Sequence, residues 1–439
     1  MAARPNFVFI LADDFGYADL GCYGGRSPCS PVLDRMAREG VRFTDGYANS
    51  ALCSPSRFAL ITGRYQYRFR GAAEEPLTER TRDRLDVGLP AEHPTLPSLL
   101  RAAGYATALC GKWHLGYPPR FGPRKSGYDE FFGSLSGAVD YFTHCNPAGR
   151  HDLYDGDREV ACTGYLTDLI TARACDFVRR MGERKAPFFL SVHYTAPHWP
   201  WETRDDAAVS AGIHGRIQHT DGGSVALYQT MIRHMDEGIG LLFDALERTG
   251  ANANTLVVFT SDNGGERFSD TWPLVGTKMD LLEGGIRVPM IARWPGRIPP
   301  GGVTDQVAIL MDWLPTMLAA ADVPGSPTHP PDGRDVAPVL VNPAATFRRD
   351  LFWRLKFRDQ RAMRSGTWKY LALQGDEFLF DLARDPRERA NRARAEPGAL
   401  AEMKQRFETW EATMPPIPAD AVVSHAYTRA EVAAPSSSG

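Results

Sequence analysis

The sequence lacks any long uninterrupted apolar run. Although 43% of its 439 residues are hydrophobic, no stretch approaches the roughly 20 residues that a membrane-spanning helix needs. It also lacks a charge bias, because the formal net charge is only −3. A nearly neutral chain of this length offers no electrostatic reason for binding nucleic acid or an anionic bilayer. We therefore expect neither nucleic acid nor a membrane as a partner.

Cysteine is sparse, and its spacing is unpaired. The seven cysteines form no CxxC motif and no Cys/His cluster that would suit a soft metal such as zinc. Cys22 and Cys29 are near enough in sequence to bridge, but free thiols are expected in a reducing compartment. The apolar run at residues 7–12 is too short for a signal-peptide core and ends in two aspartates. We therefore expect a cytoplasmic protein.

Short β-branched and aromatic segments alternate with amphipathic segments over the first three quarters of the chain. This alternation predicts an α/β fold: a large, mostly parallel sheet sandwiched by helices. In such folds, ligands bind beyond the carboxyl ends of the strands. The predicted strands are residues 7–11, 106–110, 187–193, 256–261 and 289–294, and the predicted helices are 95–103, 224–248 and 311–321.

The pattern of apolar and turn residues changes after two proline-rich stretches near residues 324–343. Four strand-like segments separated by turn residues follow and predict an antiparallel meander, and a helix is predicted at 397–410. We therefore predict a large α/β domain over residues 1–340, a smaller C-terminal domain (antiparallel sheet plus helix) over 341–425, and a flexible tail over 426–439.

Two pairs of side chains with oxygen ligands follow predicted strands. Asp13 and Asp14 come directly after the first strand, and Asp262 and Asn263 follow the strand at 256–261. Adjacent carboxylates at the mouth of a parallel sheet repel each other unless a cation lies between them. An isolated pair would ordinarily be a cap or a solvated turn. Two such pairs at equivalent strand ends, without histidine or cysteine, favour Ca²⁺ or Mg²⁺ over Zn²⁺.

The most informative motif begins at Cys53. Residues 53–57 read CSPSR, and residues 62–64 read TGR. This segment resembles the signature of the type I sulfatases, Cys-x-Pro-x-Arg followed four residues later by Thr-Gly. Further blocks resemble that family in the same order, over roughly residues 5–392: GKWHLG at 111–116, GYDEFFG at 127–133 with Ser136-Gly137, a strand ending at His193 with the loop PHWP at 197–200, GTK at 276–278, EGGIRVP at 283–289, and FDL through DP and Glu388 at 380–388.

The resemblance implies an alkaline phosphatase-like fold and hydrolysis of sulfate esters by an arylsulfatase-like enzyme. A separate formylglycine-generating enzyme would oxidise Cys53 to formylglycine, whose hydrated aldehyde carries two hydroxyls on one carbon. One hydroxyl attacks sulfur in line with the departing alcohol or phenol, whose bond to sulfur breaks. The other then loses its proton, so that sulfate leaves and the aldehyde is regenerated. A thiol is a poor nucleophile for this ester, and a serine hydroxyl would leave a stable enzyme-bound sulfate.

The resemblance also assigns roles to individual residues. Asp13, Asp14, Asp262, Asn263 and position 53 would bind the cation, expected to be Ca²⁺ with Mg²⁺ or Mn²⁺ as alternatives. Five other side chains would act on the nucleophile or the substrate: Arg57 and Lys112 on the gem-diol, His114 as base for the elimination, and His198 and Lys278 on the sulfate and the leaving oxygen. Ser136 and His193 fit the family pattern most loosely.

The sequence leaves alternatives to a sulfatase open. A phosphonate monoester or phosphodiester hydrolase of the same superfamily could use the same nucleophile and metal ligands. A dizinc phosphatase is disfavoured because it needs several histidines at the strand ends. A non-catalytic relative would be expected to have lost Cys53 or the basic residues. The substrate could be a phenolic or a carbohydrate sulfate, and His144, His151, Trp199 and Trp201 are candidates to line its pocket.

Overall fold

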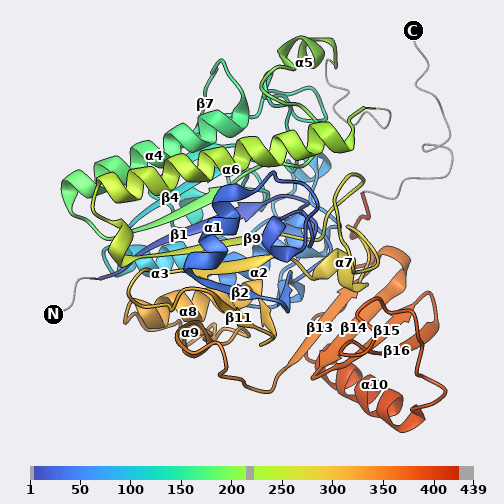
Figure 1. The fold of residues 1–439 in the computed structure, drawn as a ribbon. Coiled ribbons are helices and arrows are strands. Elements are labelled where there is room, and N and C mark those ends of the chain that lie inside the picture. The colour runs from blue at the N-terminus through green and yellow to red at the C-terminus, as the bar shows by residue number, and fades with distance from the viewer. Residues whose placement is uncertain (1–3, 214–221, 425–439) are drawn as a thin grey trace.

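The computed structural model describes residues 4–213 and 222–424; the predicted tail at 426–439 lies outside them. Within these residues, ten strands form one sheet in the order β11-β2-β10-β9-β1-β8-β4-β5-β6-β7 (Figure 1). The strands are β1 (Asn6–Ala12), β2 (Val41–Phe43), β4 (Ala106–Gly111), β5 (Glu130–Gly133), β6 (Tyr154–Asp155), β7 (Arg158–Glu159), β8 (Phe188–His193), β9 (Thr255–Ser261), β10 (Met290–Arg293) and β11 (Gly302–Thr304).

The centre of the sheet is parallel. Strands β9, β1, β8, β4 and β5 all run in one direction, whereas β10 runs antiparallel between β9 and β2. Strand β1 is apolar at every position from 7 to 12 because both of its faces are covered. Val8 and Ile10 enter one core cluster, and Phe7, Phe9 and Leu11 enter the other. The predicted mostly parallel, helix-covered sheet is confirmed.

Helices cover both faces of this sheet. On one face α4 (Leu166–Arg184) and α6 (Val225–Arg248) lie side by side, with α1 (Pro31–Glu39) next to them (Figure 1). The opposite face is covered by α2 (Cys53–Thr62), α3 (Leu96–Ala102) and α8 (Trp313–Ala320). Helix α2 is buried over its whole length, so its amino terminus has a fixed place within the protein.

The central strands end at the same level. Ala12 of β1 lies opposite Ser261 of β9, and Leu11 lies opposite His193 of β8. His193 in turn lies opposite Gly111 of β4. Whatever follows these four strands is therefore gathered along one edge of the sheet.

A second sheet of four antiparallel strands is formed by β13 (Asp350–Leu355), β14 (Gln360–Ser365), β15 (Trp368–Leu373) and β16 (Asp376–Asp381), with α10 (Pro397–Glu411) packed on it. This is the predicted meander plus helix, and it lies beside the carboxyl edge of the large sheet (Figure 1). These elements fall within residues 341–425, although the domain boundaries themselves stay a prediction. No helix among the described residues has the length and apolarity needed to cross a bilayer.

Candidate active site at the carboxyl edge of the sheet

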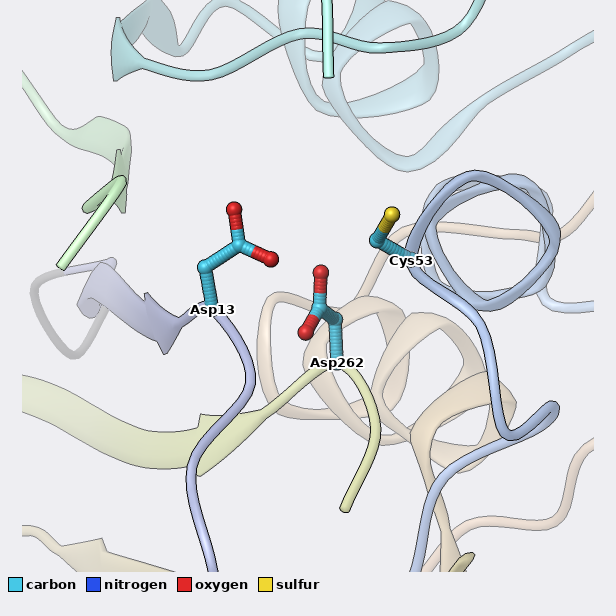
Figure 2. A group of neighbouring side chains, drawn as sticks. All are labelled: Asp13, Cys53 and Asp262. Atoms are coloured by element: carbon cyan, nitrogen blue, oxygen red, sulfur yellow. The ribbon is translucent and has the colours of Figure 1, made fainter. Parts of the chain in front are cut away.

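The predicted site residues come together at this edge. Asp13 and Asp14 follow β1, Asp262 and Asn263 follow β9, and Cys53 is the first residue of α2. Figure 2 shows Asp13, Asp262 and Cys53 around one common space, and one oxygen or sulfur atom from each lies within 4.8 Å of the others. All five residues are buried.

The oxygen donors of this cluster are incompletely paired. Asp13 Oδ1 and Asn263 Oδ1 are buried and accept no hydrogen bond from the described residues. Buried acceptors without partners are costly. The Asn263 amide donates to Asp14 Oδ1 over 2.7 Å, which leaves its own oxygen free. Carboxylate and amide oxygens are the ligands of hard divalent cations, so the donor set fits a Ca²⁺ or Mg²⁺ ion.

Three basic side chains surround the carboxylates. Arg57 donates to Asp262 Oδ2 over 2.9 Å, and Lys112 Nζ donates to Asp13 Oδ2. Lys278 Nζ lies 2.6 Å from Asp14 Oδ2. Each basic group is almost fully buried. Their three positive charges balance the three carboxylates of the cluster.

The two adjacent aspartates have opposite pKa shifts. Burial and the neighbouring charge of Asp262 raise the pKa of Asp13 well above its ordinary value, and Lys112 and Arg57 offset this only in part. Burial would also raise the pKa of Asp14, but Lys278, His198 and Lys112 outweigh it and lower that pKa. Asp13 is thus the carboxylate whose negative charge is least compensated by the protein.

Cys53 is held as a neutral thiol. Burial raises its pKa to about 11 despite Lys112 and Lys278. Thiolates are the nucleophilic form of cysteine, so this thiol is inert at neutral pH. No side chain caps the amino terminus of α2; its free N–H groups and the helix dipole favour an anion beside Cys53.

Two histidines complete the site. His114 Nε2 lies 2.7 Å from the Leu77 carbonyl, so that nitrogen carries the proton and Nδ1 keeps a free lone pair. Burial first, and Lys112 second, lower the pKa of His114 well below its usual value. His198 Nδ1 donates to the Trp199 carbonyl over 2.6 Å, and Nε2 lies 3.5 Å from Asp14 Oδ2.

A cavity of about 290 Å³ opens in front of Cys53, His114 and His198. Its outer wall comes from loops: residues 76–80, residues 136–138, Pro147, Ala148, Trp199 and Ser424. Ser136 therefore reaches the site, whereas His193 hydrogen-bonds the Lys112 carbonyl over 3.3 Å beneath it. The pocket-lining prediction holds for Trp199.

That prediction is wrong for His144, His151 and Trp201, which do not line the cavity. Trp201 packs on Phe268, and His144 lies against His151. Sequence reasoning missed Glu79, Arg80 and Ser424. These residues stand in irregular segments, where no periodicity indicates the direction of a side chain.

Comparison with known proteins agrees with this geometry. The family model "Sulfatase" matches residues 5–323, and the model "N-sulphoglucosamine sulphohydrolase, C-terminal" matches residues 277–411. N-acetylgalactosamine-6-sulfatase of Rattus norvegicus is 35% identical over 358 residues, which cover 77% of this chain and 66% of the relative. The chain thus spans just under two thirds of the length of that relative.

Two further matches extend over more of the fold. Arylsulfatase A of Homo sapiens is 33% identical over 464 residues, covering 92% of this chain and 86% of the relative. The crystal structure of Ps i-CgsB in complex with k-i-k-neocarrahexaose superposes with a TM-score of 0.83 at 32% identity, covering 94% of each chain. With the strand-end acidic cluster and the Cys53 helix in place, these matches show that the chain belongs to the sulfatase family.

Proposed function

We propose that this protein hydrolyses sulfate esters, with formylglycine formed from Cys53 as its nucleophile and one divalent cation beside it. The observation that carries the proposal is the position of Cys53. It begins a buried, uncapped helix and faces two strand-end aspartates within 4.8 Å. A reactive cysteine would instead need a depressed pKa, and here burial raises it.

Modification to formylglycine would supply a hydrated aldehyde, whose two hydroxyls permit attack on sulfur and later release of sulfate. The modification requires a transient encounter with a formylglycine-generating enzyme. The cation, proposed to be Ca²⁺ and held by Asp13, Asp14, Asp262, Asn263 and position 53, would supply electrostatic stabilisation of the charge that gathers on the sulfate oxygens.

Arg57 and Lys112 hold the nucleophile's surroundings in place. The guanidinium of Arg57 bonds Asp262 and also donates to the Lys112 carbonyl over 3.1 Å. This ties the β9 end, the β4 end and α2 together. Because both side chains are basic and lie near position 53, they are placed to stabilise a hydroxyl that is losing its proton.

His114 is placed to act as the base of the elimination step. Its lowered pKa keeps the ring neutral at physiological pH, and the Leu77 carbonyl fixes the tautomer that exposes the Nδ1 lone pair. A base needs that free lone pair within reach of the proton it removes. His114 and Cys53 line the same cavity.

Lys278 and His198 are placed to bind the sulfate and the leaving oxygen. Both contact Asp14 Oδ2, Lys278 Nζ at 2.6 Å and His198 Nε2 at 3.5 Å, and His198 also lines the cavity. Burial and Lys278 lower the pKa of His198 well below its ordinary value. A bound sulfate would add negative charge and raise that pKa, so His198 would take up a proton as the substrate arrives. Lys278 carries a permanent charge for the same oxygens.

The substrate proposed is a carbohydrate sulfate, with aryl sulfates as small surrogates. The relatives are named for N-acetylgalactosamine 6-sulfate and aryl sulfates, and the Ps i-CgsB structure holds a hexaose. The cavity of about 290 Å³ has the size for one ring beside the sulfate.

The competing activity is phosphonate monoester hydrolysis. The test compares kcat/KM for 4-nitrophenyl sulfate with that for 4-nitrophenyl phenylphosphonate, using protein whose Cys53 peptide is about 18 Da lighter than the cysteine form and reacts with a hydrazide. We expect the sulfate to be preferred, and Cys53→Ser to lose at least about 1,000-fold in kcat without unfolding. A preference for the phosphonate, or full turnover by the serine variant in a host that cannot modify serine, would overturn the proposal.

A further inference from the structure

The cavity in front of Cys53 has a reacting end and a leaving-group end. Cys53, His114 and His198 form the reacting end. The other end is built by residues 76–80 together with Pro147, Ala148, Trp199 and Ser424. The side chains of Pro76, Leu77, Pro147 and Ala148 offer a ring no hydrogen bonds, so the polar and charged side chains at this end bear on which leaving groups are favoured.

Two charged side chains line the leaving-group end, and they differ in their surroundings. Glu79 is half-buried, and its carboxylate has several polar partners. It pairs with Arg82, accepts a hydrogen bond from Asn146 Nδ2 over 3.1 Å, and lies 3.6 Å from Arg150. Arg80 is exposed and makes no side-chain hydrogen bond or ion pair within the described residues. Arg80 is therefore a positive charge at the cavity mouth that no carboxylate of these residues neutralises.

The backbone that carries Arg80 is held on several sides. It lies in the short 3-10 turn Glu79–Thr81, where the Thr81 hydroxyl donates to the Thr78 carbonyl over 2.7 Å. Just before this turn, the Leu77 N–H donates to Ser54 Oγ over 2.9 Å, one residue from Cys53. The guanidinium thus extends from an anchored turn beside the nucleophile.

The C-terminal segment contacts the chain just before this turn. Glu75 pairs with Val423 as an isolated parallel bridge, and the Ser424 N–H donates to the Glu75 carbonyl over 2.8 Å. Asp420 pairs with Arg70 and Arg84, at 2.9 and 3.1 Å. Asp420 therefore pairs with these two arginines and does not pair with Arg80.

We propose that Arg80 is a specificity-determining residue that binds a second anionic group, a sulfate or a carboxylate, on the leaving group. This proposal rests on the proposed sulfatase function and narrows its substrate to saccharides that carry another acidic substituent. A guanidinium offers paired donors that match the oxygens of such groups. Because Arg80 has no partner among the described residues, binding an anion there breaks no existing ion pair of the protein.

The test measures inhibition of 4-nitrophenyl sulfate hydrolysis, which requires no cleavage at a particular sugar position. The probes are N-acetylgalactosamine 6-sulfate and N-acetylgalactosamine 4,6-disulfate. We expect the wild type to bind the disulfate about tenfold more tightly, as one charge-assisted contact allows, and we expect added salt to reduce this preference. Arg80→Ala should abolish the preference, which is measured as the ratio of the two inhibition constants within one variant, and Arg80→Lys should retain part of it.

The matched control is Arg120→Ala. Arg120 is another exposed arginine whose side chain makes no hydrogen bond or ion pair within the part of the chain that the structure describes, and it does not line the cavity. It should keep the wild-type preference. Equal binding of the two sugars by the wild type, or an unchanged preference in Arg80→Ala, overturns this inference alone, because 4-nitrophenyl sulfate is still hydrolysed. If protein carrying formylglycine does not hydrolyse 4-nitrophenyl sulfate, the proposed function falls and the inference with it.

Discussion

At the scale of single residues, burial decides how the charged groups of this protein behave. Asp13 and Glu202 are fully buried, and burial raises the pKa of both. Burial and the charge of Asp262 raise the pKa of Asp13, and the basic partners Lys112 and Arg57 offset this in part. Glu202 has no such partner: it accepts from the Tyr141 N–H over 3.1 Å and lies beside Asp140. Its pKa is raised to about 9, by burial first and by the charge of Asp140 second.

Glu202 should make the protein less stable as the pH rises. The group is protonated in the folded protein up to about pH 9 but ionises near pH 4.5 when unfolded. The folded state then binds more protons, so the free energy of unfolding falls with pH across that window, by up to about 1.4 kcal/mol per unit. We expect Glu202→Gln, which mimics the protonated acid, to flatten the fall in Tm between pH 5 and 9. Parallel Tm curves for the two proteins would contradict this assignment.

The site residues were predictable where a strand places them. Asp13, Asp262 and Lys112 each follow a buried strand directly, and parallel strands end together. Arg80 and Ser424 were not predictable, because irregular segments have no period and the Glu75–Val423 bridge joins residues almost 350 positions apart. The sequence contained no local signal for that contact.

At the scale of elements, the small sheet holds the loop that carries Lys278. The side chain of Gln360, the first residue of β14, accepts from the Leu281 N–H and donates to the Met279 carbonyl, both over 2.8 Å. Lys369 of β15 pairs with Glu283 and Glu388, at 3.0 and 2.8 Å. These contacts fix the backbone on the C-terminal side of Lys278, which points back to Asp14.

Gln360 is therefore a positioning residue, and Gln360→Ala should slow turnover. Loss of two hydrogen bonds to the loop lets the Lys278 ammonium move, and we expect kcat to fall about tenfold while Tm falls only modestly. The matched control is Gln306→Ala. Gln306 is also buried and bonds two backbone groups, Val307 and Phe347, away from Lys278. An equal loss of kcat in the two variants would mean that Gln360 affects turnover only through the stability of the protein.

Some helices and strands could be predicted from the sequence, and others could not. The strands β1, β4, β8 and β9 are short apolar runs and were predicted to within one or two residues. Helix α4 was not predicted, although its buried residues, among them Ile170, Ala174, Phe177 and Met181, recur at helical spacing. The two-residue strands β6 and β7 could not be predicted, because only the pairing of β6 with β5 and of β7 with β6 defines them.

At the scale of the whole molecule, the acidic cluster joins segments from distant parts of the chain. Asp13 directly follows β1, the first strand of the chain, whereas Asp262 and Asn263 come about 250 residues later. Arg57, Lys112 and Lys278 bring three further segments to the same point. A cation bound there would link the segments only when the sheet is folded, so its binding free energy adds to the stability of the native state.

Calcium should therefore raise the Tm of the whole protein. At a concentration 100-fold above its dissociation constant, a ligand that binds only the folded state contributes about 2.7 kcal/mol, enough for a shift of a few degrees. We expect Ca²⁺, and more weakly Mg²⁺ or Mn²⁺, to stabilise chelator-treated protein, since the donors are all oxygen. Asp13→Asn should lose most of the gain, while Asp19→Asn, a buried aspartate outside the proposed ligand set, should keep it. A larger shift with Zn²⁺, or a gain that survives Asp13→Asn, would place the cation elsewhere.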